Sequence, residues 1–295
     1  TTGRRTALAK WISDPANPLT ARVMVNRVWQ YHFGRGLLST PSDFGTRSGA
    51  PSHPELLDWL ASEFAEKGWS VKQLHRLIMT SATYQQQSTP AKEAVERDPA
   101  NVLLSHFSRR RVTSEELRDS VLIATASLNP KRGGRPVVPP LTAEEKATLT
   151  QSPENAWVLT KDTSEYLRRS IYMIQKRTFR MPMMEVFDSP ESMLTCSRRE
   201  SSTTAPQSLT LFNGTFTLER ARGLAQSLEK KHGSSDDACV RAAFRQVLSR
   251  EPRSDEAERA ETFIKVQMAN TGGRTGAYTE LIRALLNVNE FLYVD

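Results

Sequence analysis

Cysteine is scarce in this chain, which has two cysteines among 295 residues. Neither lies in a CxxC or CxxCH motif, so the chain can build neither a zinc knuckle nor a covalent c-type haem attachment. We therefore expect no cofactor in this chain. Cys196 and Cys239 could form one disulfide in an oxidising compartment, or both could be buried free thiols.

Long apolar runs are lacking as well. No stretch approaches the roughly 20 apolar residues that a membrane-spanning helix needs, so we predict no membrane span. The first residues, Thr1-Thr2-Gly3-Arg4-Arg5, resemble neither a secretory signal nor a natural start. We therefore expect a piece of a longer chain, in which a missing signal says nothing about export.

Short catalytic motifs are missing too. The sequence has no GxGxxG or Walker A motif for a nucleotide and no GxSxG motif for a serine hydrolase. Its five histidines show neither HxH nor HExxH spacing, so we predict no metal site. Folding could still bring some of the histidines together.

Charge is present in both signs. Forty basic and 33 acidic residues give a net charge of +7 and a pI of about 9.5, which favours anionic partners. The basic residues are spread along the chain, whereas a nucleic-acid binder needs one concentrated patch. Nucleic-acid binding is therefore disfavoured.

The apolar residues recur at helical spacing nearly throughout, which predicts an all-α fold in one large multi-helix domain. Within that domain we expect a helical part over 1–128 and a second helical part over 161–295. The segment between them, 129–160, begins with NPKRGGRPVVPP and predicts a loop or insertion, because its prolines and glycines break helices. Residues 166–184 suit a strand or a buried helix equally.

Capping residues place several helix ends. Asn17-Pro18 and Gly34 delimit one helix, and Thr113 with Glu116 forms a capping box for another. Between them we predict a helical hairpin with Ser52 and Glu55 capping its first helix, Lys67-Gly68-Trp69 as its turn and Ser70 starting its second helix. The polar stretch 85–98 predicts an exposed linker. Further helices are predicted over 205–213, 215–231, 236–249, 255–270 and 278–287.

Few side chains are candidates for catalysis. A histidine near a carboxylate can act as a general base, and a thiolate beside arginines can be nucleophilic. The alternative interpretation is structural: His53-Pro54 begins a helix, and Arg198 pairs with Asp188 or Glu200 in an ionic network. The candidate catalytic residues are His53, Asp43, Asp188, Cys196 and Glu200.

Arginine clusters are candidates for ligand binding. Guanidinium groups donate paired hydrogen bonds to sulfate, carboxylate or phosphate, so converging clusters would suit a sulfated or uronic glycan. The alternative is a set of salt bridges to nearby carboxylates. Four tryptophans, Trp11, Trp29, Trp59 and Trp69, fit core packing, whereas Trp157 could stack on a sugar. The candidate ligand-binding residues are Arg109, Arg110, Arg168, Arg169, Arg198 and Arg199.

Nine motifs in order carry a family resemblance. They are NPLTARVMVNRVWQYHFGRGLL, DFG, PSHPELLDWLASEF, GWSVKQLHRLIMTSATY, RRRVTSEELRDS, RRSIYMIQKR, FDSP, CSRRESSTTAPQSLTLFN and LLNVNEFLYVD. These motifs span nearly the whole chain and resemble domain-of-unknown-function family 1553, the planctomycete-type PSD domain. The family has no agreed catalytic residues to transfer.

The resemblance implies a context. Such domains usually end long exported proteins that carry a cytochrome c-like domain and a family 1549 domain upstream, so haem is expected only in a separate domain. Export implies a periplasmic or cell-surface location. The resemblance also implies a link to extracellular polysaccharide breakdown.

Three hypotheses follow. The first is a non-catalytic module that docks to the upstream domains and presents a surface to an anionic glycan. The second is an enzyme acting on sulfated polysaccharide, which requires at least two of the candidate catalytic side chains to meet in one pocket. The third is a nucleic-acid binder, which requires a continuous basic stripe.

Overall fold

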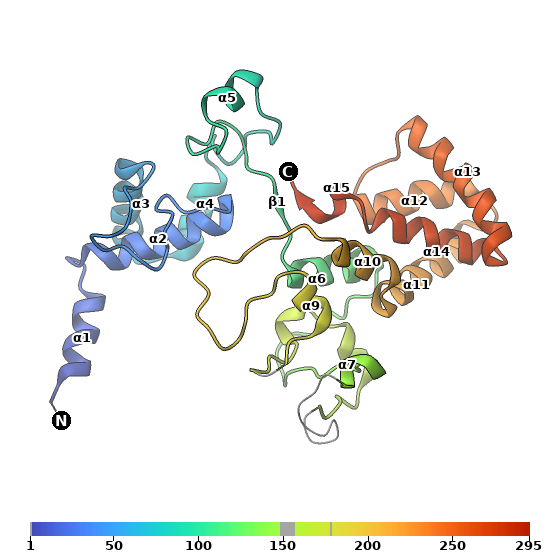
Figure 1. The fold of residues 1–295 in the computed structure, drawn as a ribbon, viewed down its shortest axis with the longest axis horizontal. Helices are drawn as coiled ribbons and strands as arrows, with labels where there is room; N and C mark the ends of the chain where they lie inside the picture. The colour runs from blue at the N-terminus through green and yellow to red at the C-terminus, as the bar shows by residue number, and fades with distance from the viewer. Residues whose placement is uncertain (1, 148–156, 178) are drawn as a thin grey trace. The chain divides into compact units, whose positions relative to one another are not determined.

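The computed structural model describes residues 2–147, 157–177 and 179–295 and is mainly helical, which confirms the predicted all-α class. Its contacts group the chain into two compact units, residues 1–110 together with Asp295, and residues 111–294. The two units are coloured from blue to green and from green to red in Figure 1. The Pro/Gly-rich segment 129–160 lies inside the second unit, and the three-part division of the chain stays a prediction.

The first unit contains five helices: α1 (Arg4–Ser13), α2 (Pro18–Phe33), α3 (Pro54–Glu66), α4 (Val71–Met79) and α5 (Lys92–Arg97). The predicted ends of α2 are confirmed. Asn17 accepts a hydrogen bond from the Leu19 N–H at the start, and Gly34 ends the helix at φ +76°. Helix α5 lies within the stretch that the sequence predicts as a linker.

The hairpin formed by α3 and α4 differs from the prediction at its beginning. The residue before α3 is His53, and the Ser52 hydroxyl instead donates to the Leu37 carbonyl, so the predicted Ser52 cap is wrong. The turn is as predicted, because Gly68 adopts φ +68° and the Ser70 hydroxyl caps α4 through the Gln73 N–H.

A single core joins α2, α3 and α4. Its buried residues are apolar at the helix positions that face one another, and Trp29 stacks on Phe33 with ring centroids 4.3 Å apart. Trp69 packs against the same core, whereas Trp11 and Trp59 are 55% and 51% exposed, so the prediction that they fill a core is wrong. All ten residues of α1 are exposed.

The second unit begins at Arg111, within strand β1 (Arg110–Arg111). Strand β1 pairs with the C-terminal strand β2 (Tyr293–Val294). Helix α6 (Ser114–Ala124) follows, and the predicted Thr113–Glu116 capping box is present. The segment that suited a strand or a helix forms instead two short 3-10 helices, η1 (Thr163–Leu167) and η2 (Ser170–Tyr172), before α9 (Pro182–Val186). Helix α7 (Ala143–Ala147) lies in the middle segment.

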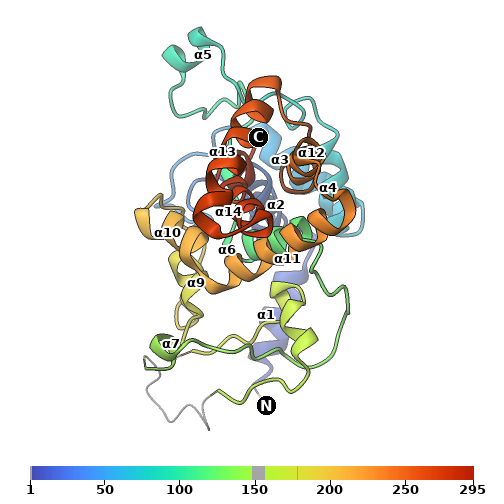
Figure 2. The same ribbon diagram turned by 90° about the vertical axis from the view of Figure 1, so that its right-hand side faces the viewer.

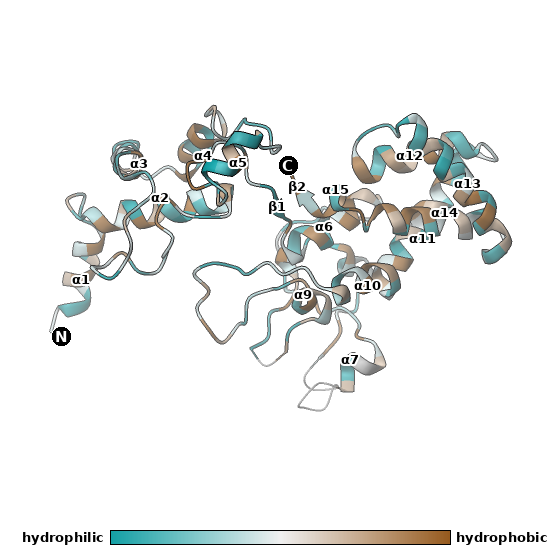
Figure 3. Cartoon of the chain, turned by 45° about the horizontal axis from the view of Figure 1, so that its top comes forward, coloured by the Kyte–Doolittle hydropathy of each residue, from teal (hydrophilic) through white to brown (hydrophobic). Residues whose placement is uncertain are grey.

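Six further helices lie in the described part of this unit: α10 (Ala205–Asn213), α11 (Thr215–His232), α12 (Asp236–Leu248), α13 (Ser254–Thr271), α14 (Arg274–Leu285) and α15 (Asn289–Leu292). Helices α11 to α14 pack together, as Figures 1 and 2 both show. Each of these helices carries both hydrophobic and hydrophilic residues in Figure 3, as amphipathic helices do. The predicted helix 278–287 begins four residues earlier, at Arg274.

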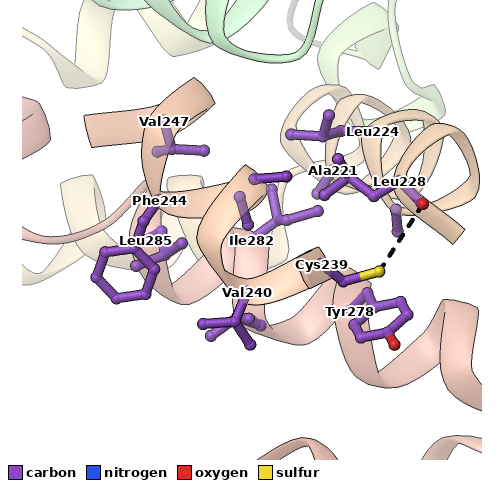
Figure 4. Close-up of a cluster of buried hydrophobic side chains, with 14 of the residues drawn as sticks. Ala221, Leu224, Leu228, Cys239, Val240, Phe244, Val247, Tyr278, Ile282 and Leu285 are labelled. Carbon is purple, nitrogen blue, oxygen red and sulfur yellow. Dashed lines mark hydrogen bonds between the residues drawn. The ribbon is translucent and has the colours of Figure 1, made fainter. Parts of the chain in front are cut away.

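The largest core of the molecule lies among these helices. Leu224, Val240, Tyr278 and Ile282 pack there with the buried Cys239, whose thiol donates to the Leu228 carbonyl (Figure 4). Burial raises the pKa of the Cys239 thiol, so this thiol is a packed, protonated group. Both cysteines are free, and Cys196 is exposed, so they are not two buried thiols.

Candidate functional site

Asp188 and Ser202 hold together the two ends of a long surface loop. The Ser202 N–H donates to Asp188 Oδ2 at 2.9 Å, and the Ser202 hydroxyl donates to Asp188 Oδ1 at 2.8 Å. The loop between them, residues 189–201, leaves α9 and returns to α10 as a wide turn of chain (Figure 1). Surface loops with closely held ends are frequently functional.

Arg111 and Gln207 complete this arrangement, which we call the Asp188 cluster (Arg111, Asp188, Ser202 and Gln207). Arg111 donates from Nη2 to Asp188 Oδ2 at 2.5 Å and from Nη1 to Gln207 Oε1 at 2.7 Å. Arg111 also donates to the Ser202 carbonyl, and the Gln207 amide donates to the Val186 carbonyl at 3.0 Å. The cluster therefore joins β1, the end of α9 and the start of α10.

Local sequence explains how two of these side chains are placed. Helix α9 ends where Asp188 adopts φ +60°, a left-handed conformation that aspartate tolerates better than most residues. Thr204, Pro206 and Gln207 form the start of α10, and the Thr204 N–H donates to the Gln207 side chain. Gln207 therefore caps a helix and binds Arg111 with the same oxygen.

The cluster is largely shielded from water. The Arg111 side chain is 5% exposed, and its guanidinium lies 5.7 Å from the centroid of the Phe187 ring. Burial tends to raise the pKa of the Asp188 carboxyl, but hydrogen bonds from Ser202 and the ion pair with Arg111 outweigh burial and hold this pKa below its usual value. Asp188 is therefore ionised at neutral pH.

The loop itself is exposed from Glu191 to Ser201. Met193 and Leu194 are 62% and 71% exposed, which is unusual for large apolar side chains. Arg199 forms a two-bond ion pair with Glu115, with Nη1–Oε2 and Nη2–Oε1 distances of 2.5 and 3.1 Å. Burial would raise the pKa of Glu115, but the pair with Arg199 lowers it. Arg198, by contrast, makes no ion pair within the described part of the chain.

The candidate catalytic residues do not gather in one place. Asp43 accepts the Gly45 N–H in a turn of the first unit, and His53 hydrogen-bonds the Ser52 hydroxyl through Nδ1 at 3.0 Å. Asp188 lies in the Asp188 cluster, while Cys196 and Glu200 lie on the exposed loop. Among the described residues, no hydrogen bond or ion pair joins any two of the five, and their catalytic role stays a prediction.

The sequence analysis predicted an ionic network around Asp188, and the structure contains one, but its arginine is Arg111. Asp188 pairs with Arg111, not with Arg198 as the sequence suggested. The thiol of Cys196 donates to the Arg198 carbonyl at 3.2 Å, which places the two residues side by side on the loop. Sequence reasoning missed Arg111 as a site residue, although it is the last arginine of the Arg109–Arg111 run.

The candidate ligand-binding arginines have different surroundings. Arg168 is buried, donates to Glu165 Oε2 at 2.7 Å and lies 3.9 Å from the Tyr172 ring centroid. Arg169 lies 3.5 Å from Asp119 and is exposed. Arg109 pairs with Asp295 at 2.5 Å, and Arg110 lies on β1. Arg168 therefore holds the fold, and the role of all six in ligand binding stays a prediction.

A second buried arginine supports the same segment. Arg118 donates to the Arg168 carbonyl at 2.8 Å, and Asp119 accepts the Ser170 N–H at 2.7 Å. Burial lowers the pKa of Arg118 to about 10, against the opposing charge of Asp119. These contacts fix η1 and η2 on α6.

The pockets formed by the described residues include one in each unit. One of about 330 Å³ lies between α3 and α4 beside Phe64 and Leu74. The other, of about 340 Å³, is bordered by Lys131, Glu165 and Arg168. Neither is bordered by a candidate catalytic residue. Trp157 is 5% exposed and its Nε1 donates to the Pro139 carbonyl, so the prediction that it could stack on a sugar is wrong.

Helices and a loop with closely held ends together define a helical module with an exposed surface loop. The family model described as "Protein of unknown function (DUF1553)", named PSD1, matches residues 4–264, and the chain belongs to this family. No curated protein and no solved structure matches the chain. Of the helices described, none is long and apolar enough to cross a membrane.

Proposed function

We propose that this chain is a non-catalytic binding module that uses the 189–201 loop to bind an anionic glycan. The observation that carries the proposal is the loop itself: its ends are held by the Asp188 cluster while residues 191–201 are all exposed. A loop whose ends are already fixed loses less conformational entropy when it binds a ligand.

Arg198 is the residue we assign to the anionic group. The neighbouring Arg199 is occupied by Glu115, whereas Arg198 is exposed and makes no ion pair with the residues described. A guanidinium donates two parallel hydrogen bonds to a sulfate or a carboxylate, which suits sulfated and uronic-acid glycans. The exposed Met193 and Leu194 would cover the apolar face of a sugar ring.

The test is a binding screen of the purified chain against sulfated, uronic and neutral glycans at low and moderate salt. We expect saturable binding to an anionic glycan, weakened at least tenfold by Arg198→Ala and unchanged by Arg132→Ala, an exposed arginine of the Pro/Gly-rich segment. Equal binding by both variants would contradict the assignment. Release of new reducing ends from the bound glycan would instead support the enzyme hypothesis.

We further propose that the module belongs to an exported multidomain protein and docks to cytochrome c-like and family 1549 domains. Helix α1 supports this docking, because Leu8, Trp11 and Ile12 are exposed along a helix whose ten residues are all exposed. Trp11→Glu is expected to weaken association with the recombinant domains in a sedimentation assay, and Lys10→Glu is the matched control. Unchanged association of the Trp11→Glu variant would exclude α1 as the docking surface.

A further inference from the structure

Two histidines that are far apart in sequence face each other in the first unit. His32 lies near the end of α2 and His75 lies in α4, and His32 Nε2 is 2.8 Å from His75 Nδ1. The ring centroids are 5.0 Å apart, and the ring planes make an angle of 72°. The edge of the pair is covered by Tyr84, whose ring centroid lies 5.4 Å from that of His32.

The two facing nitrogens can share one proton, with one ring as donor and the other as acceptor. Neutral imidazole is the form that binds metals. The pair therefore offers two nitrogen donors from two helices in a half-buried position.

We propose that His32 and His75 form a binding site for a late first-row divalent metal ion such as Zn²⁺, Ni²⁺ or Cu²⁺, bound by His32 Nε2 and His75 Nδ1, with each ring keeping its one proton on its other nitrogen. Metal–nitrogen bonds of 2.0–2.1 Å at a tetrahedral angle place two imidazole centroids about 5.2 Å apart. The present centroid distance is 5.0 Å, and rotation of the rings would have to widen the nitrogen–nitrogen distance from 2.8 Å to about 3.3 Å.

The donor set defines which ions fit. Imidazole nitrogen suits zinc, nickel and copper, whereas calcium and magnesium require oxygen ligands. Over the described ranges of the chain, no group of three or more His, Cys, Asp and Glu side chains gathers for a metal, so water must complete the coordination. The positive charge of Arg110 opposes the ion. We therefore expect dissociation constants in the micromolar range rather than the tight binding of a structural zinc site.

The test uses the untagged chain after treatment with a chelator. Titration with Zn²⁺ alone, followed by calorimetry, is expected to show one site per chain, weakened at least tenfold by His32→Gln and by His75→Gln. His106→Gln is the matched control, because His106 is a half-buried histidine of the same unit that contacts the Ser105 hydroxyl and not another histidine. Its binding should equal that of the unchanged chain.

A second measurement keeps the proposal testable if a variant fails to fold. Zn²⁺ at ten times its dissociation constant should raise the unfolding midpoint of the unchanged chain, because ligands that bind the folded state stabilise it. Failure of the unchanged chain to bind Zn²⁺, Ni²⁺ or Cu²⁺ below about 100 μM would overturn the proposal. So would binding that survives in folded His32→Gln and His75→Gln variants.

Discussion

At the scale of single residues, the ion pair between Arg111 and Asp188 holds the Asp188 cluster together. Arg111 is nearly buried, and its charge is balanced by one carboxylate, Asp188. The sequence could not predict this pair, because 77 positions separate the two residues and three arginines stand in a row. Short-range patterns select Arg198 as the partner, whereas the fold brings Arg111 closer.

Replacing that carboxylate tests the role of the pair. Asp188→Asn keeps the shape of the side chain but leaves the Arg111 charge without its partner, and should lower the free energy of unfolding by about 3 kcal/mol. Ser202→Ala removes one hydrogen bond to the ionised Asp188 carboxylate but leaves the ion pair, and should cost about 2 kcal/mol. Urea denaturation of both variants measures the difference. Equal losses would show that the ion pair adds nothing beyond its hydrogen bonds.

Ionisation of the Glu256 carboxyl makes the free energy of unfolding depend on pH in the acid range. Hydrogen bonds from Arg250 at 2.7 and 2.8 Å lower the pKa of Glu256 from 4.5 to about 2, against the effect of burial. Because the folded-state pKa is depressed, this stabilisation is complete above about pH 4.5 and is lost as the pH falls towards 2. The unfolding midpoint of Glu256→Gln should therefore fall less steeply between pH 5 and pH 2.5. A slope equal to that of the unchanged chain would contradict this.

At the scale of helices and loops, the sequence predicted the end of a helix correctly where a nearby capping residue sets that end. Thr113 with Glu116, Asn17-Pro18 and Ser70 each cap a helix through neighbours within a few positions, so the sequence alone locates those ends. The predicted cap at Ser52 was wrong, because the Ser52 hydroxyl donates to the Leu37 carbonyl, 15 positions away in the sequence. The sequence could not decide between a strand and a helix over 166–184, because the conformation there depends on Arg118 and Asp119 of α6.

The capping box of α6 gives a prediction at this scale. Thr113→Ala removes the acceptor for the Glu116 N–H and should lower the free energy of unfolding by about 1 kcal/mol. Thr113→Ser keeps the hydroxyl and should differ little. Thermal unfolding followed by circular dichroism compares the two, and similar losses would place the effect in the methyl group instead of the cap.

At the scale of the whole molecule, the chain has a separate core in each unit. The buried residues of α2, α3 and α4 form one, and those of α11 to α14 form another. The sequence predicted that helices would dominate, because amphipathic spacing is local. It could not place the change of unit at Arg110 and Arg111, since this position has none of the proline or glycine that marks linkers.

Two core substitutions test whether the two units unfold independently of each other. Leu60→Ala and Leu224→Ala each remove a buried side chain and should cost about 2–5 kcal/mol. Hydrogen exchange should speed up mainly within residues 2–110 for Leu60→Ala and mainly within 111–294 for Leu224→Ala. Faster exchange throughout the chain in both variants would mean that the two units unfold together.

The held ends of the 189–201 loop also bear on protein engineering. Since Asp188 and Ser202 fix the distance between those ends, extra residues placed among the exposed positions 191–201 change only the length of the closed segment. Doubling a flexible loop costs only about 0.6 kcal/mol in closure entropy. A peptide epitope or a reporter sequence inserted after Thr195 should therefore leave the helical scaffold folded. The same tolerance would let this loop vary in length and composition during evolution without change to the rest of the protein.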